Sequence, residues 1–185
     1  MTSPERSGGA SPDAAGTNSR AASRAAKNRF VVWLCVACAV VLVDQTSKWV
    51  ALKFLRVGDV IYVAPFFDWV LAFNTGAAFS FLAGAGGWQR WFFIVLSLVA
   101  SVWIVFLLKH HAPETRFAFA LSMVLGGAIG NVVDRVSIGA VVDFIQWHAG
   151  GYYWPAFNAA DSAITLGALV LVWDQFASEA QGKAK

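Results

Sequence analysis

The sequence predicts an all-α membrane protein with four transmembrane helices and a small extracytoplasmic β-rich cradle. Hydrophobic residues make up 58% of the 185 residues and charged residues only 14%, whereas a soluble domain is about half apolar and a quarter charged. Four long apolar stretches, with a β-rich segment between the first two, complete the evidence. An ordinary soluble enzyme is thereby excluded, and the 15 Phe and 9 Trp exclude a disordered chain.

The chain begins with a polar segment. Residues 1–29 are rich in Ser, Ala and Gly with scattered Arg, and no apolar period runs through them. We therefore expect a disordered cytoplasmic tail. The first apolar stretch, residues 30–52, contains only Asp44 and Lys48 as charged residues. A cleaved signal peptide is the weaker interpretation of this stretch, because these two residues continue the helix.

Three further apolar stretches follow, at residues 91–108, 117–133 and 152–173. A bilayer core of about 30 Å needs about 20 apolar residues at about 1.5 Å of rise each, so all four stretches are candidates to span it. We place the spans at about residues 30–52, 90–108, 117–136 and 155–174. The membrane domain then covers residues 30–178, and a cytoplasmic tail covers residues 179–185.

Two segments between spans have the pattern of short strands. Residues 53–90 contain alternating or β-rich runs that are broken by Gly58, Pro65 and further glycines. Residues 137–153 are similar but shorter. Such runs bounded by turn residues predict a few strands on the outer surface.

Loop charge predicts the orientation. With four spans both termini lie on one face, together with the loop between the second and third spans. That face collects most of the basic residues, namely Arg6, Arg20, Arg24, Lys27, Arg29, Lys109, Arg116, Lys183 and Lys185. The positive-inside rule places this face, with both termini, in the cytoplasm. Aromatic residues crowd the opposite ends of the spans, as an interfacial belt does: Trp88, Trp91, Trp147, Tyr152, Tyr153 and Trp154.

Polar residues inside the spans converge on one outer level. Asp44 lies 14 residues beyond the start of the first span, about 21 Å along the helix. Asn131 lies equally far into the third span, and Asp134 is one turn further. Asp161 lies 12 residues before the inner end of the fourth span, about 18 Å from it, and Asp143 just precedes that span. Because intramembrane polar groups are costly, each needs a partner or a function.

Some of these residues have a structural interpretation. Asp44 and Lys48 are four positions apart in the order that favours an ion pair along one helix, so we expect them to support the site without performing chemistry. Asn131 shares a helix face with Asp134 and with Arg135, so these three could brace one another.

Asp143 and Asp161 differ because neither has a basic residue within four positions. An acid in an outer loop is usually solvated, whereas Asp161 could cap its helix or find a partner elsewhere in the fold. Two carboxylates at one site share a proton, which supplies one general base and one general acid. That pair is sufficient for peptide hydrolysis without a metal or another cofactor.

Other chemistries have little support in the sequence. There is no H-E-x-x-H motif, His110 and His111 lie on the opposite face, and Ser162 has no nearby histidine except His148. Intramembrane Asp, Asn and Lys also occur in proton-coupled transporters. A small transporter is therefore the alternative, although no inverted repeat is visible.

Five blocks carry a family resemblance. They are VDQTSK, FNTGAAFS, GGAIGNVVDR, VVDFI and FNAADSAI, which occur in this order between about residues 30 and 176. On these blocks the sequence resembles the lipoprotein signal peptidases, the signal peptidase II family of membrane aspartyl proteases. The order of all five is specific, while any single block is weak evidence.

The resemblance implies a four-helix enzyme that removes the signal peptide before the diacylglyceryl-modified cysteine of bacterial lipoprotein precursors. It implies that Asp143 and Asp161 form the catalytic dyad. Supporting or substrate-binding roles are implied for Asp44, Lys48, Asn74, Gly76, Asn131, Asp134, Arg135 and Asn158. It also implies diacylglyceryl-modified substrates, the lipid bilayer and globomycin-like inhibitors as partners, and no metal.

Overall fold

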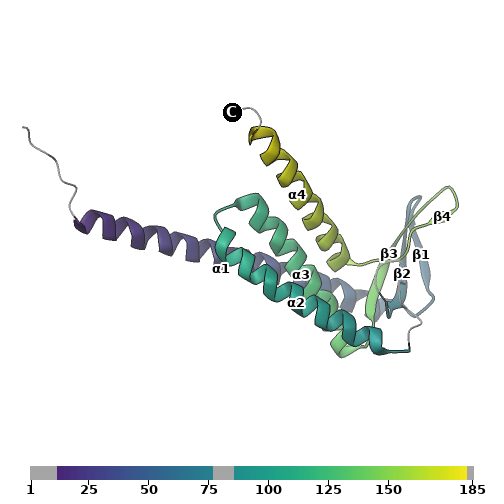
Figure 1. Ribbon diagram of the computed structural model, residues 1–185. Helices are drawn as coiled ribbons and strands as arrows, with labels where there is room; N and C mark the ends of the chain where they lie inside the picture. Colours follow the sequence, from purple (N-terminus) through teal and green to yellow (C-terminus); the bar gives the residue numbers. More distant parts are fainter. Residues whose placement is uncertain (1–11, 77–85, 183–185) are drawn as a thin grey trace, which may run out of the picture.

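The computed structural model describes residues 12–76 and 86–182, which form four helices and four strands. The helices are α1 (Pro12–Phe54), α2 (Trp88–His111), α3 (Thr115–Ser137) and α4 (Ala159–Gly182). The strands are β1 (Val60–Ala64), β2 (Phe67–Asn74), β3 (Val141–Ala149) and β4 (Tyr152–Tyr153). The sheet lies at one end of the helices (Figure 1), so the fold is mostly helical with a small β-rich part, as the sequence predicts.

Three helices are long and apolar enough to cross a membrane: Ser23–Phe54 within α1, Trp88–His111 and Thr115–Ser137. They correspond to the first three predicted spans. Within the described residues α4 does not qualify by the same measure, because Asp161 and Asp174 lower its hydropathy. The length of α2, 24 residues, corresponds to about 36 Å and exceeds the hydrocarbon core.

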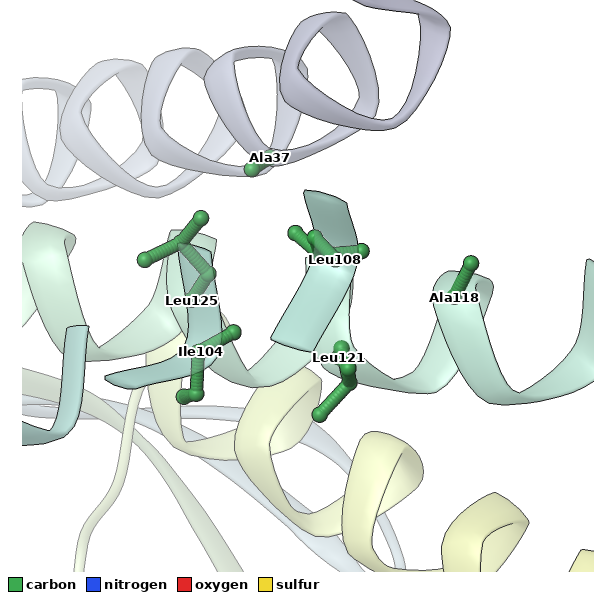
Figure 2. Close-up of a cluster of buried hydrophobic side chains, with 6 residues drawn as sticks. All are labelled: Ala37, Ile104, Leu108, Ala118, Leu121 and Leu125. Carbon is green, nitrogen blue, oxygen red and sulfur yellow. The ribbon is translucent and has the colours of Figure 1, made fainter. Parts of the chain in front are cut away.

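α3 is the central helix and packs against α1, α2 and α4. Figure 2 shows the apolar cluster that joins α1, α2 and α3, formed by Ala37, Ile104, Leu108, Ala118, Leu121 and Leu125. Close approach of the helices requires glycine on α3. A Cβ at Gly130 would lie 2.5 Å from Asp44 Oδ2, so a side chain there would displace that carboxylate.

The strands form one antiparallel arrangement in the order β1-β2-β3-β4, which confirms the prediction of strands in both outer segments. Ala72 pairs with Asp143, and Asn74 pairs with Val141. A second apolar cluster attaches the sheet to the end of α1, through Ala51, Leu55, Leu71, Val142 and Phe144. This attachment fixes β3 relative to the polar residues of α1.

The helix α1 begins earlier than the sequence suggested. We expected residues 1–29 to be disordered, but residues 12–29 continue the helix of the first span. Residues 1–11 lie outside the described part. The residues just before the span are rich in Ala, which has the highest helix propensity, so this composition favours extension of a helix begun in the span.

The helix α4 begins later than the sequence suggested. We expected the fourth span from about residue 155, but Tyr152 and Tyr153 pair with β3, and Phe157 makes an isolated bridge to Ile145. These backbone hydrogen bonds continue the sheet, so the helix starts only at Ala159. The apolar composition of the segment did not distinguish a strand from a helix.

Candidate active site

Lys48 is the centre of a buried polar group between α1 and α3. Its Nζ lies 2.8 Å from Asp44 Oδ2 and 2.7 Å from Asp134 Oδ2, and it donates to Asn131 Oδ1 at 3.0 Å. Asp44 is 0% exposed and Lys48 is 2% exposed. The expected ion pair along α1 is therefore present, and the same ammonium group also pairs with a carboxylate of α3.

Gln45 is a member of this group that we did not single out from the sequence. Its Nε2 donates to Asp134 Oδ1 at 2.9 Å, and to Asp44 Oδ2 and the Gly130 carbonyl oxygen at 3.1 Å. The signal that could have found it is an amide beside a carboxylate within an apolar helix.

The two carboxylates of this group also hold backbone. Asp44 Oδ1 accepts the N–H of Ala160 at 2.8 Å, and Asp134 Oδ2 accepts the N–H of Val142 at 3.1 Å. Ala160 directly precedes Asp161, and Val142 directly precedes Asp143. Each carboxylate of the buried group therefore fixes the backbone next to one of the other two aspartates.

Asp161 lies in the first turn of α4 and forms a reciprocal cap with Asn158. Its backbone N–H donates to Asn158 Oδ1 at 2.9 Å, while its Oδ2 accepts the backbone N–H of Asn158 at 3.3 Å. This is the pattern of a capping box, in which the side chain three residues after the cap reaches back. Asn131 Nδ2 donates to Asp161 Oδ1 at 2.8 Å. Both sequence-based interpretations, a cap and a partner from elsewhere, are therefore correct.

Asp143 is buried within β3, so the solvated state that is usual for an acid in an outer loop does not apply to it. It is 2% exposed, because the VVDFI segment forms the strand between β2 and the N-terminus of α4. Its Oδ1 accepts Asn158 Nδ2 at 2.7 Å. Burial raises the pKa of Asp143 to about 7, and the negative charge of Asp161 adds to the rise. Hydrogen bonds from Asn158 and Asn74 oppose the rise without cancelling it.

Arg135 connects α3 to the residues that follow β2. Its Nη2 donates to the Gly76 carbonyl oxygen at 2.8 Å, and its guanidinium lies 5.1 Å from the ring centre of Phe93. The expected bracing of Arg135 and Asn131 is limited to a 3.5 Å contact with the backbone oxygen of Asn131. Gly76 donates its N–H to Asn74 Oδ1 at 2.9 Å. The rest of the FNTGAAFS block, residues 77–80, lies outside the described residues.

Asp143 and Asp161 line a cleft, whereas Asp44 and Asp134 do not. A cleft of about 900 Å³ is lined by Asp143 and Asp161, and also by Asn74, Asn131 and Arg135. Its other walls are mostly apolar residues of the sheet, of the segment before α4 and of α4 itself, among them Phe73, Trp147, Trp154, Phe157, Ile164, Leu166 and Leu169. The cleft therefore has a polar floor with two acids and an apolar side along α4.

The serine and the histidine considered for another chemistry have other described partners. The Ser162 hydroxyl donates to the backbone oxygen of Asn158 at 2.9 Å, and His148 lies 3.4 Å from Asp68. Across residues 12–76 and 86–182, no three His, Cys, Asp or Glu side chains are grouped so that they could hold a metal ion.

Comparisons with known proteins agree with the family resemblance of the five sequence blocks. The family described as signal peptidase (SPase) II matches residues 36–177. The lipoprotein signal peptidase of Paraburkholderia phymatum is 51% identical over 157 residues, which cover 85% of this chain and 95% of that protein. The lipoprotein signal peptidase of an Azoarcus species is 52% identical over 156 residues, covering 84% and 89% respectively.

A solved structure is also similar. A bacterial membrane enzyme determined by the in meso method at 2.3 Å resolution superposes with a TM-score of 0.75 at 31% sequence identity, over 83% of this chain and 93% of that one. None of these similarities supports a transporter. The agreement in sequence, in fold and in the order of the motif blocks shows that this chain belongs to the signal peptidase II family, the lipoprotein signal peptidases, which are membrane proteases.

Proposed function

We propose that this protein is an aspartic endopeptidase in which Asp143 and Asp161 act together. The observation that carries the proposal is the shared contact with Asn158, whose side chain donates to one aspartate and accepts from the backbone of the other. Both aspartates line the same cleft. In the described part of the chain, neither carboxylate is within ion-pair distance of Lys or Arg, in contrast to Asp44 and Asp134.

The mechanism needs one proton on the pair. Asp143 carries it, because burial and the charge of Asp161 raise its pKa to about 7, well above the usual range of a carboxyl group. Asp161 accepts N–H donors on both carboxylate oxygens, which orients it as the acceptor. Asp161 removes a proton from water while the water oxygen attacks the scissile carbonyl carbon, and Asp143 donates its proton to the carbonyl oxygen.

The resulting tetrahedral intermediate has two hydroxyl groups on one carbon. Asp161 then gives its proton to the leaving amide nitrogen as the carbon–nitrogen bond breaks. Asp143 takes back a proton from one of the two hydroxyl groups as the carboxylic acid product forms. The pair returns to its starting state with one proton, so water is consumed and no cofactor is required.

The substrate is a lipoprotein precursor whose signal peptide is cut before a diacylglyceryl-modified cysteine. The apolar side of the cleft supports this choice, because Leu166 and Leu169 of α4 are exposed as well as cleft-lining. A lipidated substrate can then enter from the side while its acyl chains remain among the lipids. Globomycin-like peptides are proposed to occupy the same cleft.

We further propose that α4 is a fourth transmembrane helix and that residues 30–178 form one membrane domain. The exposed apolar residues Val172, Trp173 and Phe176 continue the lipid-compatible surface of α4 towards its end. Both termini are then cytoplasmic, and the cleft opens near the extracytoplasmic face of the inner membrane.

The test is cleavage of a lipidated precursor peptide by the purified protein, with a chelator and without added metal. We expect a cut before the modified cysteine, and a loss of about 10²–10⁴ in rate for Asp143→Asn and for Asp161→Asn, because each variant lacks one proton-transfer group. The matched control is Asp68→Asn, which replaces another buried carboxylate of the same sheet that does not line the cleft. Substantial turnover in either of the first two variants would contradict the dyad.

A further inference from the structure

Two separate pieces of backbone carry the proposed dyad, and only noncovalent contacts fix the distance between them. The Asn158 side chain and the bridge of Ile145 to Phe157 are two of these contacts. Asp143 lies in β3 and Asp161 lies at the start of α4. A dyad that shares one proton depends on that distance, since a displacement of about 1 Å can cost about 10²-fold in rate. The residues that hold these two pieces of backbone are therefore part of the reaction's geometry.

Asp44 and Asp134 hold the same two pieces of backbone from the side of the helices. Asp44 binds the N–H of the residue before Asp161, and Asp134 binds the N–H of the residue before Asp143, at 2.8 and 3.1 Å. The spacing of the dyad therefore also depends on the spacing of these two carboxylates, which come from different helices, α1 and α3.

Two like charges do not stay side by side without donors between them. Lys48 contacts the Oδ2 atoms of both carboxylates, at 2.8 and 2.7 Å. Gln45 Nε2 makes the second bridge, to Asp44 Oδ2 at 3.1 Å and to Asp134 Oδ1 at 2.9 Å. It also donates to the Gly130 carbonyl oxygen at 3.1 Å, which attaches the bridge to the backbone of α3.

A neutral donor suits this position. One Lys between two carboxylates leaves a net negative charge, and a second cation would compete with Lys48 for the same oxygens. The Gln45 amide supplies N–H groups without adding charge, so both carboxylates can accept hydrogen bonds at the same time.

We propose that Gln45 is a positioning residue that, together with Lys48, sets the separation of Asp143 and Asp161 by bridging the carboxylates of Asp44 and Asp134. The proposal rests on the proposed function. Gln45 is not among the residues that line the cleft, so it acts only through its neighbours. Its removal should slow the chemical step and leave substrate binding almost unchanged.

The experiment compares Gln45→Met and Gln45→Glu with the unmodified full chain in detergent micelles, using the lipidated precursor peptide. The Met side chain has similar length but no donor, so we expect kcat to fall about 10- to 100-fold with KM within about twofold. The carboxyl introduced in Gln45→Glu must hold a proton between two carboxylates and can then donate one hydrogen bond. We therefore expect its kcat to lie between those of Gln45→Met and the unmodified protein.

The matched control is Gln175→Met, the same substitution at an exposed position near the end of α4, where the amide contacts only Glu179 among the described residues. It should leave kcat unchanged. A lower melting temperature of Gln45→Met with an unchanged kcat of the folded fraction would show a merely structural role and overturn the inference. If Gln45→Met does not fold, equal kcat values of Gln45→Glu and the unmodified protein at every pH would overturn it as well.

In the same assay, Asp143→Asn tests the proposed function separately from the role of Gln45. An inactive Asp143→Asn together with a fully active Gln45→Met overturns only the positioning role. A fully active Asp143→Asn overturns the dyad, whatever the result at Gln45. An inactive Asp143→Asn with a reduced kcat and an unchanged KM for Gln45→Met supports both.

Discussion

Two pairs of carboxylates lie next to each other in this protein, and they differ in the groups that contact them. Asp44 and Asp134 share Lys48 and Gln45 and do not line the cleft. Asp143 and Asp161 line the cleft and share Asn158, a neutral amide. The first pair is fixed by a cation, whereas the second is held in place by amide groups.

The difference teaches what each pair can do. A buried carboxylate that is paired with an ammonium group keeps its charge, and breaking such a pair leaves an uncompensated buried charge. Amide donors orient a carboxylate without supplying a full charge, so a proton can still be exchanged there at neutral pH. The same residue type therefore serves structure in one pair and, in our proposal, chemistry in the other.

The largest expected effect comes from breaking the cation-paired group. Asp44→Ala leaves Lys48 with one carboxylate fewer and removes the acceptor of the Ala160 N–H. Loss of one member of a buried pair costs about 3–5 kcal/mol, so we expect a lower folded yield as well as lower activity. Thermal unfolding in detergent micelles measures the loss of stability.

The control for this prediction is Asp59→Ala, at an exposed turn where the carboxylate accepts only the N–H of Arg56 among the described residues. It should change the free energy of unfolding by no more than about 0.5 kcal/mol. A variant Asp44→Asn that is fully stable but shows no turnover would contradict a supporting role, and would assign Asp44 to catalysis or substrate binding instead.

The sequence predicted the polar convergence because depth in a helix can be counted. At about 1.5 Å per residue, Asp44, Asn131 and Asp134 reach one level whatever the rotation of their helices. The ion pair of Asp44 and Lys48 also follows from local spacing. Contacts between helices do not, because the pairing of Lys48 with Asp134 depends on how α1 and α3 are rotated and how closely they approach.

The difference between local spacing and contacts made only in the assembled fold also explains which features the sequence analysis misplaced or missed. The burial of Asp143 did not follow from the sequence, because a single sequence gives no measure of burial by a neighbouring strand. The start of α4 was misplaced because the backbone of Phe157 bridges to Ile145 of β3, which overrides an apolar pattern. Gln45 was missed because its two carboxylate partners belong to different helices, so only the assembled fold shows the bridge.

The next largest effect is expected from a change of pH near neutrality, which should alter the stability that Asp143 of the cleft-lining pair contributes. Burial raises the pKa of Asp143 to about 7, against about 3.9 in an unfolded chain. A raised carboxyl pKa contributes stability that is complete below pH ~4 and is lost as pH rises towards 7, with a slope of at most about 1.4 kcal/mol per pH unit. Asp143→Asn should remove that slope.

Melting temperatures between pH 4 and 8 measure this difference, and Asp59→Asn is the exposed control that should keep the slope. Turnover of the unmodified protein should also fall as pH rises above about 7, because Asp143 then loses the proton that it donates. Identical pH profiles of stability for Asp143→Asn and the unmodified protein would contradict the assignment of this titration to Asp143.

The smallest effect is expected from removing the first 26 residues. This change tests whether the two carboxylate pairs need the polar N-terminal segment. Figure 1 shows the first part of α1 extending beyond the other three helices, on the side away from the sheet. A chain that starts at Lys27 keeps the contacts that join α1 to the loop after α2. These are the hydrogen bond of Arg29 to the Pro113 carbonyl oxygen at 3.0 Å and that of Trp33 to the Ala112 carbonyl oxygen at 2.9 Å.

Because the described contacts of both carboxylate pairs come from residues after position 26, kcat/KM should stay within about twofold and the free energy of unfolding within about 0.5 kcal/mol. A chain that starts at Leu34 is the matched control, since it also loses both of these hydrogen bonds and should melt at a lower temperature. Loss of activity in a correctly inserted chain that starts at Lys27 would mean that the polar beginning reaches the site by a route other than these contacts. If only the shorter chain loses stability, the two carboxylate pairs depend on how α1 is anchored to the loop after α2 and not on the residues before that anchor.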